Sequence, residues 1–127
     1  MANSRVVHAA RTANLRNGSS KSSLIPITVS LDTAADFTVY TPVNADAYVA
    51  VLGFLFADAT ASNLTIKSGS TTLVTLELAA NTGLYQPVNG DIMLETAIGE
   101  ALVFNASATM SSILVHVMEI SQVSLNA

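Results

Sequence analysis

The sequence contains no cysteine and no tryptophan. The lack of cysteine excludes disulfide bonds, thiolate metal sites and thiol nucleophiles. Charge is also scarce, because only 11% of the residues are charged whereas 50% are hydrophobic. A free cytosolic enzyme normally carries a far more charged surface. A surface so poor in charge suits a protein that lies against copies of itself or a larger assembly, and we expect self-association.

Long apolar runs are absent as well. The most apolar segment, 50–57, has eight residues, whereas a membrane-spanning helix needs roughly 20. The opening residues, MANSRVVHAARTANLR, lack the continuous apolar segment of a signal peptide. We therefore expect no membrane partner, and we expect synthesis in a cytoplasm without secretion.

Charge divides the 127-residue chain into two parts. Four basic residues and no acid occur in residues 1–23, namely Arg5, Arg11, Arg16 and Lys21. Residues 24–127 contain nine acids and one base. The first part ends in NGSSKSS, a composition typical of flexible linkers. The sequence therefore predicts a flexible basic N-terminal arm over 1–23 and one folded domain over 24–127.

Three interpretations of the basic arm are open. It is a terminus with incidental charge, a segment that becomes ordered on an acidic neighbouring subunit or a larger shell, or a nucleic-acid contact. The bases are spaced five or six residues apart with no interleaved aromatic residue, which disfavours nucleic acid. We expect no direct contact with nucleic acid. The incidental terminus and the protein contact both stay open, and the four basic residues are the candidates for contact with a protein partner.

From residue 24 onward, short segments rich in Val, Ile, Leu, Thr and Phe alternate with clusters of Gly, Asn, Asp and Pro. This pattern indicates an all-β domain. Eight segments are strand candidates: 24–31, 37–41, 48–57, 64–67, 72–78, 92–96, 101–106 and 112–121. They predict a two-sheet antiparallel sandwich of jelly-roll or Greek-key type. An immunoglobulin-like topology is the alternative, although its Cys, Trp, Cys set is missing.

Some strand candidates carry a more specific expectation. Pro26 predicts that residues 24–31 form an edge strand. Residues 48–57 are apolar on both faces, which predicts a central strand that can bend at Gly53. Residues 78–91 are rich in Gly, Asn and Pro and predict a crossover loop rather than a strand.

Two further expectations concern charged residues near turns. Residues 64–67 and 72–78 predict a hairpin, in which Lys67 and Glu77 are close enough to pair. In MLETAIGEALVFNAS, residues 93–107, Glu95 and Glu100 lie on either side of a Gly-containing turn. A hairpin with both acids at its solvated end explains this stretch better than a catalytic acid and base.

Groups able to perform catalysis are few. His8 lies in the arm and His116 in the last strand candidate, so they make a poor metal site, and we expect His116 to be a hydrogen-bonded core or interface residue. No phosphate-binding loop, nucleophile elbow or zinc-protease motif occurs. The sequence predicts that the protein is not an enzyme and that it has no catalytic residue, metal or cofactor. A passive glycan-binding module stays open.

Part of the chain resembles small structural proteins of tailed bacteriophages. The resemblance rests on VLG (51–53), LTIKSGSTTL (64–73), LAANTG (78–83) and ETAIGEALVFN (95–105). It implies a capsid decoration, or cement, protein that lies on the outer surface of the head as a dimer or trimer and clamps neighbouring major capsid proteins. A head-fibre or tail module that binds a receptor or glycan is the alternative.

Overall fold

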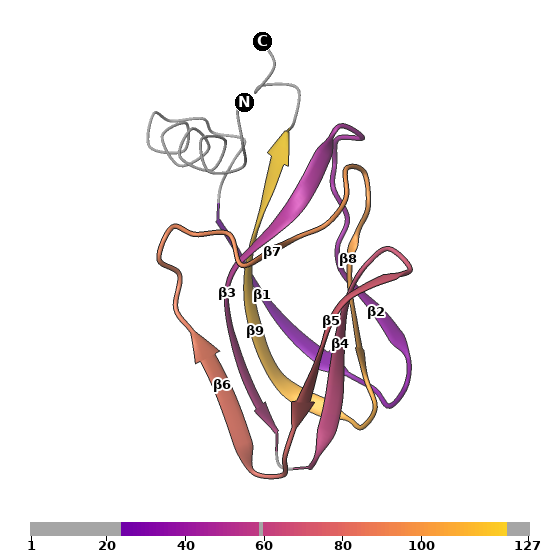
Figure 1. Cartoon of the computed structure of the whole chain (residues 1–127), viewed down its shortest axis with the longest axis vertical. Helices are drawn as coiled ribbons and strands as arrows, with labels where there is room; N and C mark the ends of the chain where they lie inside the picture. Colours follow the sequence, from indigo (N-terminus) through magenta and orange to yellow (C-terminus); the bar gives the residue numbers. More distant parts are fainter. Residues whose placement is uncertain (1–23, 59, 122–127) are drawn as a thin grey trace.

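Two antiparallel β-sheets make up the part of the chain that the computed structural model describes, residues 24–58 and 60–121 (Figure 1). Sheet A contains, in spatial order, β1 (Ile25–Leu31), β9 (Met110–Ser121), β3 (Ala47–Asp58) and β6 (Thr82–Gln86), and the short β7 (Leu94–Glu95) also pairs with β3. Sheet B contains β2 (Asp36–Tyr40), β8 (Leu102–Ala106), β4 (Ser62–Ser68) and β5 (Thr71–Leu78). The predicted all-β sandwich is confirmed.

The order of the strands identifies the sandwich as a jelly roll. β1 pairs with β9, β2 with β8, β3 with β6 and β4 with β5, all antiparallel. The strands before the β4–β5 turn therefore pair with the strands after it in reverse order. Successive pairs lie alternately in sheet A and sheet B. This connectivity selects the jelly roll over an immunoglobulin-like topology.

The crossover predicted for residues 78–91 contains a strand that the sequence pattern did not reveal. The chain leaves β5 in sheet B, turns at Asn81 with a φ of 58° and continues as β6 at the edge of sheet A. All residues of β6 except Gln86 are exposed. Because an exposed edge strand buries neither face, it lacks the apolar alternation on which the prediction depended.

The hairpin predicted between residues 92–96 and 101–106 is wrong. β7 pairs with β3 in sheet A, whereas β8 lies between β2 and β4 in sheet B. The intervening turn carries the chain from one sheet to the other, and its Gly99 has a φ of 80° and donates its N–H to Ala47 O at 2.7 Å. Two adjacent apolar segments joined by a glycine turn have the same sequence signature whether they pair with each other or with other strands.

The main core lies between the sheets and depends on β3 and β9. The buried side chains that these two strands contribute to it are Val49, Val51, Phe56, Met110, Ile113, Val115 and Val117. Phe56 contacts Phe104 of β8 edge-on, with ring centroids 6.4 Å apart. The predicted edge position of β1 and central position of β3 are confirmed, and the register between β3 and β9 shifts between Val51 and Gly53.

A second, smaller apolar cluster covers part of the other face of sheet A. Its buried members come from the first half of β3 and the last half of β9: Tyr48, Ala50, Leu52, Met118 and Ile120. Ile92, which precedes β7, packs against them, and Met93 donates its N–H to Val51 O at 2.8 Å. The chain before β7 therefore folds over this face, which explains why β3 is apolar on both sides.

No helix occurs among the described residues, and hence none there is long and apolar enough to span a membrane.

Adjacent residues of β3 test the assignment of its two faces. Phe56→Ala is expected to lower the free energy of unfolding by about 3–5 kcal/mol, because the side chain is 0% exposed and its removal leaves a cavity between the sheets. Leu55→Ala, on the opposite face and 42% exposed, is the control and should cost less than about 1 kcal/mol. Urea unfolding measures both, and equal losses would show that the face assignment is wrong.

Candidate interaction surfaces

The four predicted arm contacts lie outside the described residues. Arg5, Arg11, Arg16 and Lys21 all precede residue 24, where the described part of the chain begins. Their role and the boundary between arm and domain therefore stay predictions.

The described residues do not bring together three His, Asp or Glu side chains that could hold a metal ion. His116 lies on the outer face of sheet A, where its Cα is opposite those of Gly53 and Pro26. It is partly buried and lines a small pocket of about 150 Å³ together with Leu55 and Tyr85. The histidine therefore lies on an apolar part of the surface rather than in the core.

A carboxylate near the end of β9 ties the two sheets together. Glu119 is only 9% exposed. Its Oε1 accepts hydrogen bonds from Tyr40 Oη of β2 at 2.9 Å and from the N–H of Val43 at 2.8 Å. Its Oε2 accepts the N–H of Asn44 at 3.0 Å and Asn44 Nδ2 at 3.3 Å. One side chain of sheet A thus binds both the last residue of β2 and the loop that leads into β3.

These donors determine the ionisation of the group. Burial raises the pKa of Glu119, but the backbone N–H groups of Val43 and Asn44, followed by the two side-chain donors, outweigh it, and the pKa lies below its ordinary value of 4.5. Burial, followed by the hydrogen bond to Glu119, raises the pKa of Tyr40 above its ordinary value of 10.0. Near neutral pH the carboxylate is therefore charged while the phenol keeps its proton and donates it.

Glu100, once a candidate for acid–base chemistry, has a structural partner instead. Ser68, the last residue of β4, donates its hydroxyl to Glu100 Oε1 and accepts the N–H of Ala97 at 2.9 Å. Gly69 donates its N–H to Ala101 O at 2.9 Å. These bonds join the β7–β8 turn to the β4–β5 turn, and Glu95 lies on β7 opposite Ala50. The geometry gives Glu100 a positioning role at the end of the sandwich.

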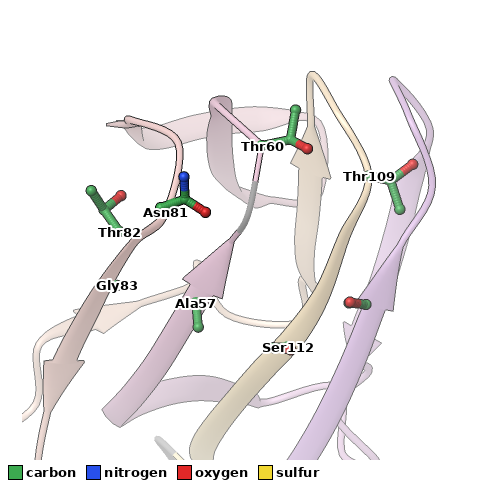
Figure 2. Close-up of a pocket in the computed structure, with 8 residues that line it drawn as sticks. Ala57, Thr60, Asn81, Thr82, Gly83, Thr109 and Ser112 are labelled. Atoms are coloured by element: carbon green, nitrogen blue, oxygen red, sulfur yellow. The ribbon is translucent and has the colours of Figure 1, made fainter.

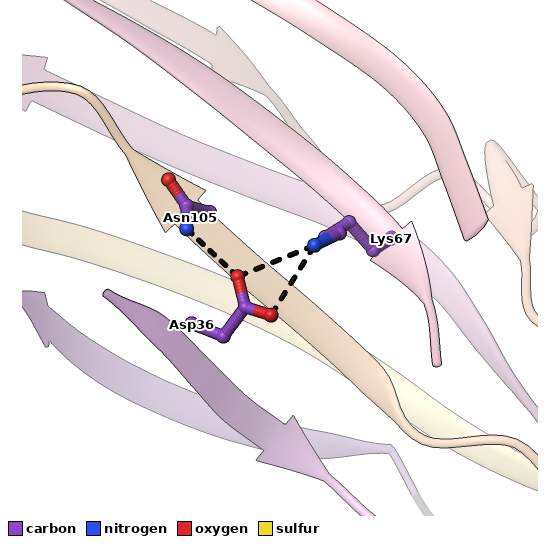
Figure 3. Close-up of polar contacts among 3 residues, drawn as sticks. All are labelled: Asp36, Lys67 and Asn105. Atoms are coloured by element: carbon purple, nitrogen blue, oxygen red, sulfur yellow. Dashed lines mark hydrogen bonds and ion pairs between the residues drawn. The ribbon is translucent and has the colours of Figure 1, made fainter. Parts of the chain in front are cut away.

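The single base of the domain pairs with a different acid from the one expected. Lys67 Nζ lies 3.2 Å from Asp36 Oδ2, and Asn105 Nδ2 donates to Asp36 Oδ1 at 2.7 Å (Figure 3). The Asn105 hydrogen bond, followed by that of Lys67, lowers the pKa of Asp36 below its ordinary value of 3.8. Glu77 is opposite Asn63, four residues from Lys67 along β4 and so about 13 Å away. The contact links β2, β8 and β4 on the outer face of sheet B.

A shallow polar pocket lies at one end of the sandwich (Figure 2). Its volume is about 680 Å³, and the residues that line it are Ala57, Thr60, Asn81, Thr82, Gly83, Thr109, Ser111 and Ser112. Figure 2 shows Thr60, Asn81 and Thr109 on neighbouring segments at this end. Most of the lining side chains carry a hydroxyl or amide group, and none is aromatic or charged. Such a lining can exchange hydrogen bonds with a polyhydroxyl ligand but offers no ring on which a sugar could stack.

No protein-family model matches the chain, and a search of curated proteins gives no match. Among solved structures, a protein of the disulfide-linked pili on Bacillus endospores matches with a TM-score of 0.43 and 13% identity, over 79% of this chain and 89% of that one. The coat protein of Tobacco streak virus matches with a TM-score of 0.42 and 11% identity, over 82% and 90%. These identities and TM-scores limit the likeness to the general arrangement of strands.

The Glu119 contacts predict a specific dependence of stability on pH. Because the pKa of Glu119 is lowered on folding, its contribution is fully present above the ordinary pKa of 4.5 and is lost as the pH falls through the folded pKa. Glu119→Gln should therefore lower the free energy of unfolding by about 1–3 kcal/mol at pH 7, and the gap to wild type should close on acidification. Denaturant unfolding across this range measures the gap.

The exposed Glu77 supplies the control. Glu77→Gln should stay within about 0.5 kcal/mol of wild type at each pH. A gap for Glu119→Gln that stays constant from pH 7 to pH 2 would contradict the assigned ionic role of the carboxylate.

Proposed function

We propose that the protein is a non-enzymatic virion structural protein that decorates a bacteriophage capsid on its outer surface. In this role it binds and bridges neighbouring major capsid proteins and so stabilises the shell. The observation that carries the proposal is the separation of charge, with four bases and no acid in residues 1–23 and nine acids with one base in the rest of the chain. The resemblance of residues 51–107 to phage structural proteins suggests that the partner is a major capsid protein.

The basic arm is proposed to supply the attachment. A segment rich in Ser, Asn and Ala with four separated bases becomes ordered most readily on an acidic surface, because each base then gains a partner and the segment has no core of its own to bury. A capsid repeats one binding site many times. Self-association of the body would present several arms together, so that modest affinity per arm gives strong overall binding.

The polar contacts in the body support a scaffold role. Glu119 links the sheets, Ser68 and Glu100 join two turns, and Asp36 pairs with Lys67 on the outer face of sheet B. Each of these groups has a partner that fixes strands or turns in place. A cement protein needs such rigidity, because it can resist expansion of a shell only if its own body does not deform.

Removal of the arm tests the attachment. The full chain should bind capsids that lack it and raise their resistance to heat, whereas a variant without residues 1–23 should lose binding by at least about tenfold. Its far-UV circular dichroism and unfolding midpoint should stay those of the full chain, because β1 begins at Ile25. Co-sedimentation with capsids measures binding, and full binding by the shortened chain would overturn the role of the arm.

Charge variants of the full chain give matched controls. Replacement of Arg5, Arg11, Arg16 and Lys21 by Gln removes four charges and keeps the length of the arm, whereas replacement of the three arginines by Lys keeps the charge. An electrostatic attachment predicts weak binding with little salt dependence for the first variant and near-normal binding for the second. Equal binding by both variants would show that length or backbone contacts, rather than charge, hold the arm.

The polar pocket favours a second candidate function, a glycan-binding module of a head fibre or tail. Its hydroxyl and amide lining suits a sugar, although the absence of an aromatic ring among the lining residues makes the site weak. A glycan array with the full chain tests it. Ser112→Ala, in the pocket, should lower the affinity for any glycan that binds about fivefold. Ser70→Ala, in the β4–β5 turn, is the control and should leave the affinity unchanged. Absence of binding to any glycan would exclude this function.

A further inference from the structure

Besides the two-residue β7, four strands lie at the edges of the two sheets, and they differ in how well they are protected against pairing with another chain. β1 contains Pro26 and a register irregularity between Val29 and Leu31. β2 and β6 have five residues each, and the register of β2 also shifts. Short length, proline and irregular pairing are the usual means by which proteins blunt a sheet edge. These three edges are therefore poor templates for a further strand.

β5 lacks most of these protections. It is the longest of the four edge strands, with eight residues of sequence TTLVTLEL, and it contains no proline, lysine or glycine. Its register irregularity lies near the turn, between Ile66 and Lys67 of β4, and the pairing from Val74 to Leu78 is regular. In the described part of the chain, β5 pairs with β4 on one side and with no strand on the other. Among the described residues its outer edge is thus unpaired, and its register is regular from Val74 to Leu78.

The direction of the main-chain groups along this edge follows from β4. The N–H of Asn63 binds Ser107 Oγ and its C=O accepts the N–H of Ser107, so both groups point towards β8. Alternate residues point the other way, and Leu64 therefore exchanges its main-chain bonds with Leu76 of β5. The N–H and C=O groups of Thr75 and Glu77 consequently point away from β4, along the open edge.

The side chains of β5 add an apolar component to this edge. Val74, Leu76 and Leu78 face the main core and are only partly buried, because no further strand flanks them. Thr75 and Glu77 are exposed on the outer face of sheet B. A strand added beside β5 would bury the first set further and leave the second set at the surface.

We propose that β5 pairs antiparallel with β5 of a second copy of this chain, with Thr75 opposite Glu77 of the second copy, so that the two sheets B become one continuous sheet. In this register Leu76 lies on the two-fold axis, opposite its own counterpart. Each Thr75–Glu77 pair exchanges both main-chain hydrogen bonds. The proposal specifies the contact behind the self-association of the proposed function.

The chemistry of the edge favours a second copy as the occupant. An antiparallel edge is complementary to itself under a two-fold axis, which a parallel edge is not. The only charged side chain of β5, Glu77, then faces the hydroxyl-bearing Thr75 rather than another carboxylate. Val74 faces Leu78 of the second copy, so the apolar inner surface continues across the axis. No other register centred on Val74–Leu78 aligns both the open main-chain groups and the charges in this way.

A single cysteine tests the register, because the chain has no thiol of its own. In the full chain Leu76→Cys should form an intermolecular disulfide under mild oxidation, since opposite residues in such a pair have Cα atoms about 4.5 Å apart. Val74→Cys is the control on the same strand and face. In the proposed register, Val74 of the second copy lies four residues, about 13 Å, along the strand from Val74 of the first. Val74→Cys should therefore form at least about tenfold less disulfide than Leu76→Cys.

Substitutions at Thr75 test the contact without altering the core. Thr75→Glu places a carboxylate opposite Glu77 of the second copy in both pairs, whereas Thr75→Lys places an opposite charge there. Thr75→Glu should raise the dissociation constant of the dimer about tenfold or more relative to Thr75→Lys. Sedimentation equilibrium measures this constant. Both variants should keep the circular dichroism spectrum of wild type.

The outcomes separate this proposal from the capsid role. A full chain that is monomeric at all concentrations, equal cross-linking of the two cysteine variants, or a dimer indifferent to the charge at Thr75 would each overturn the β5 contact. Loss of the dimer on deletion of residues 1–23 would also overturn it, because the arm would then be the occupant. None of these results depends on a capsid, and failure to bind capsids would leave the dimer intact.

Discussion

The antiparallel pairing of β3 with β9 is the contact on which the remaining elements depend. The two strands have 12 residues each, twice or more the length of several others. One face of the pair supplies the centre of the main core, and the other carries the smaller cluster beneath Ile92. β1 adds to one side of the pair and β6 to the other. Removal of this pairing would expose both apolar clusters and would separate β1 and β9 from β3 and β6.

A jelly roll requires its chain to change sheets repeatedly, and polar contacts hold these crossings. Glu119 binds the loop between β2 and β3, and Ser68 binds the turn between β7 and β8. Ser62 accepts the N–H of Ala108 at 3.2 Å at the opposite end. Each contact accepts a main-chain N–H from a segment that crosses from one sheet to the other. These donors are therefore not left unpaired. Glu119, Ser68 and Ser62 thus have a common task, which is to hold the segments that cross between the sheets.

The architecture and the proposed role are connected through the edges of the sheets. A sandwich, unlike a closed barrel, leaves an open strand on each side of each sheet. Three of these strands are short, irregular or interrupted by proline, and β5 is none of these over Val74–Leu78. In the proposed role, many copies would lie on one shell, and such an edge would let them assemble while residues 1–23 contact the shell. Low surface charge then favours association.

Alternation and apolar content follow directly from burial of one or both faces of a strand. The sequence was therefore enough to predict the all-β class, eight of the nine strands of the described residues, the edge position of β1 and the central position of β3. It also determined the division of charge between residues 1–23 and the rest. The three-dimensional structure was needed for the jelly-roll order, the presence of β6, the separation of β7 from β8 and the partners of Glu119 and Lys67. These features depend on contacts between residues far apart in the chain, such as Tyr40 and Glu119, and a local pattern contains no information about which distant strand will lie opposite.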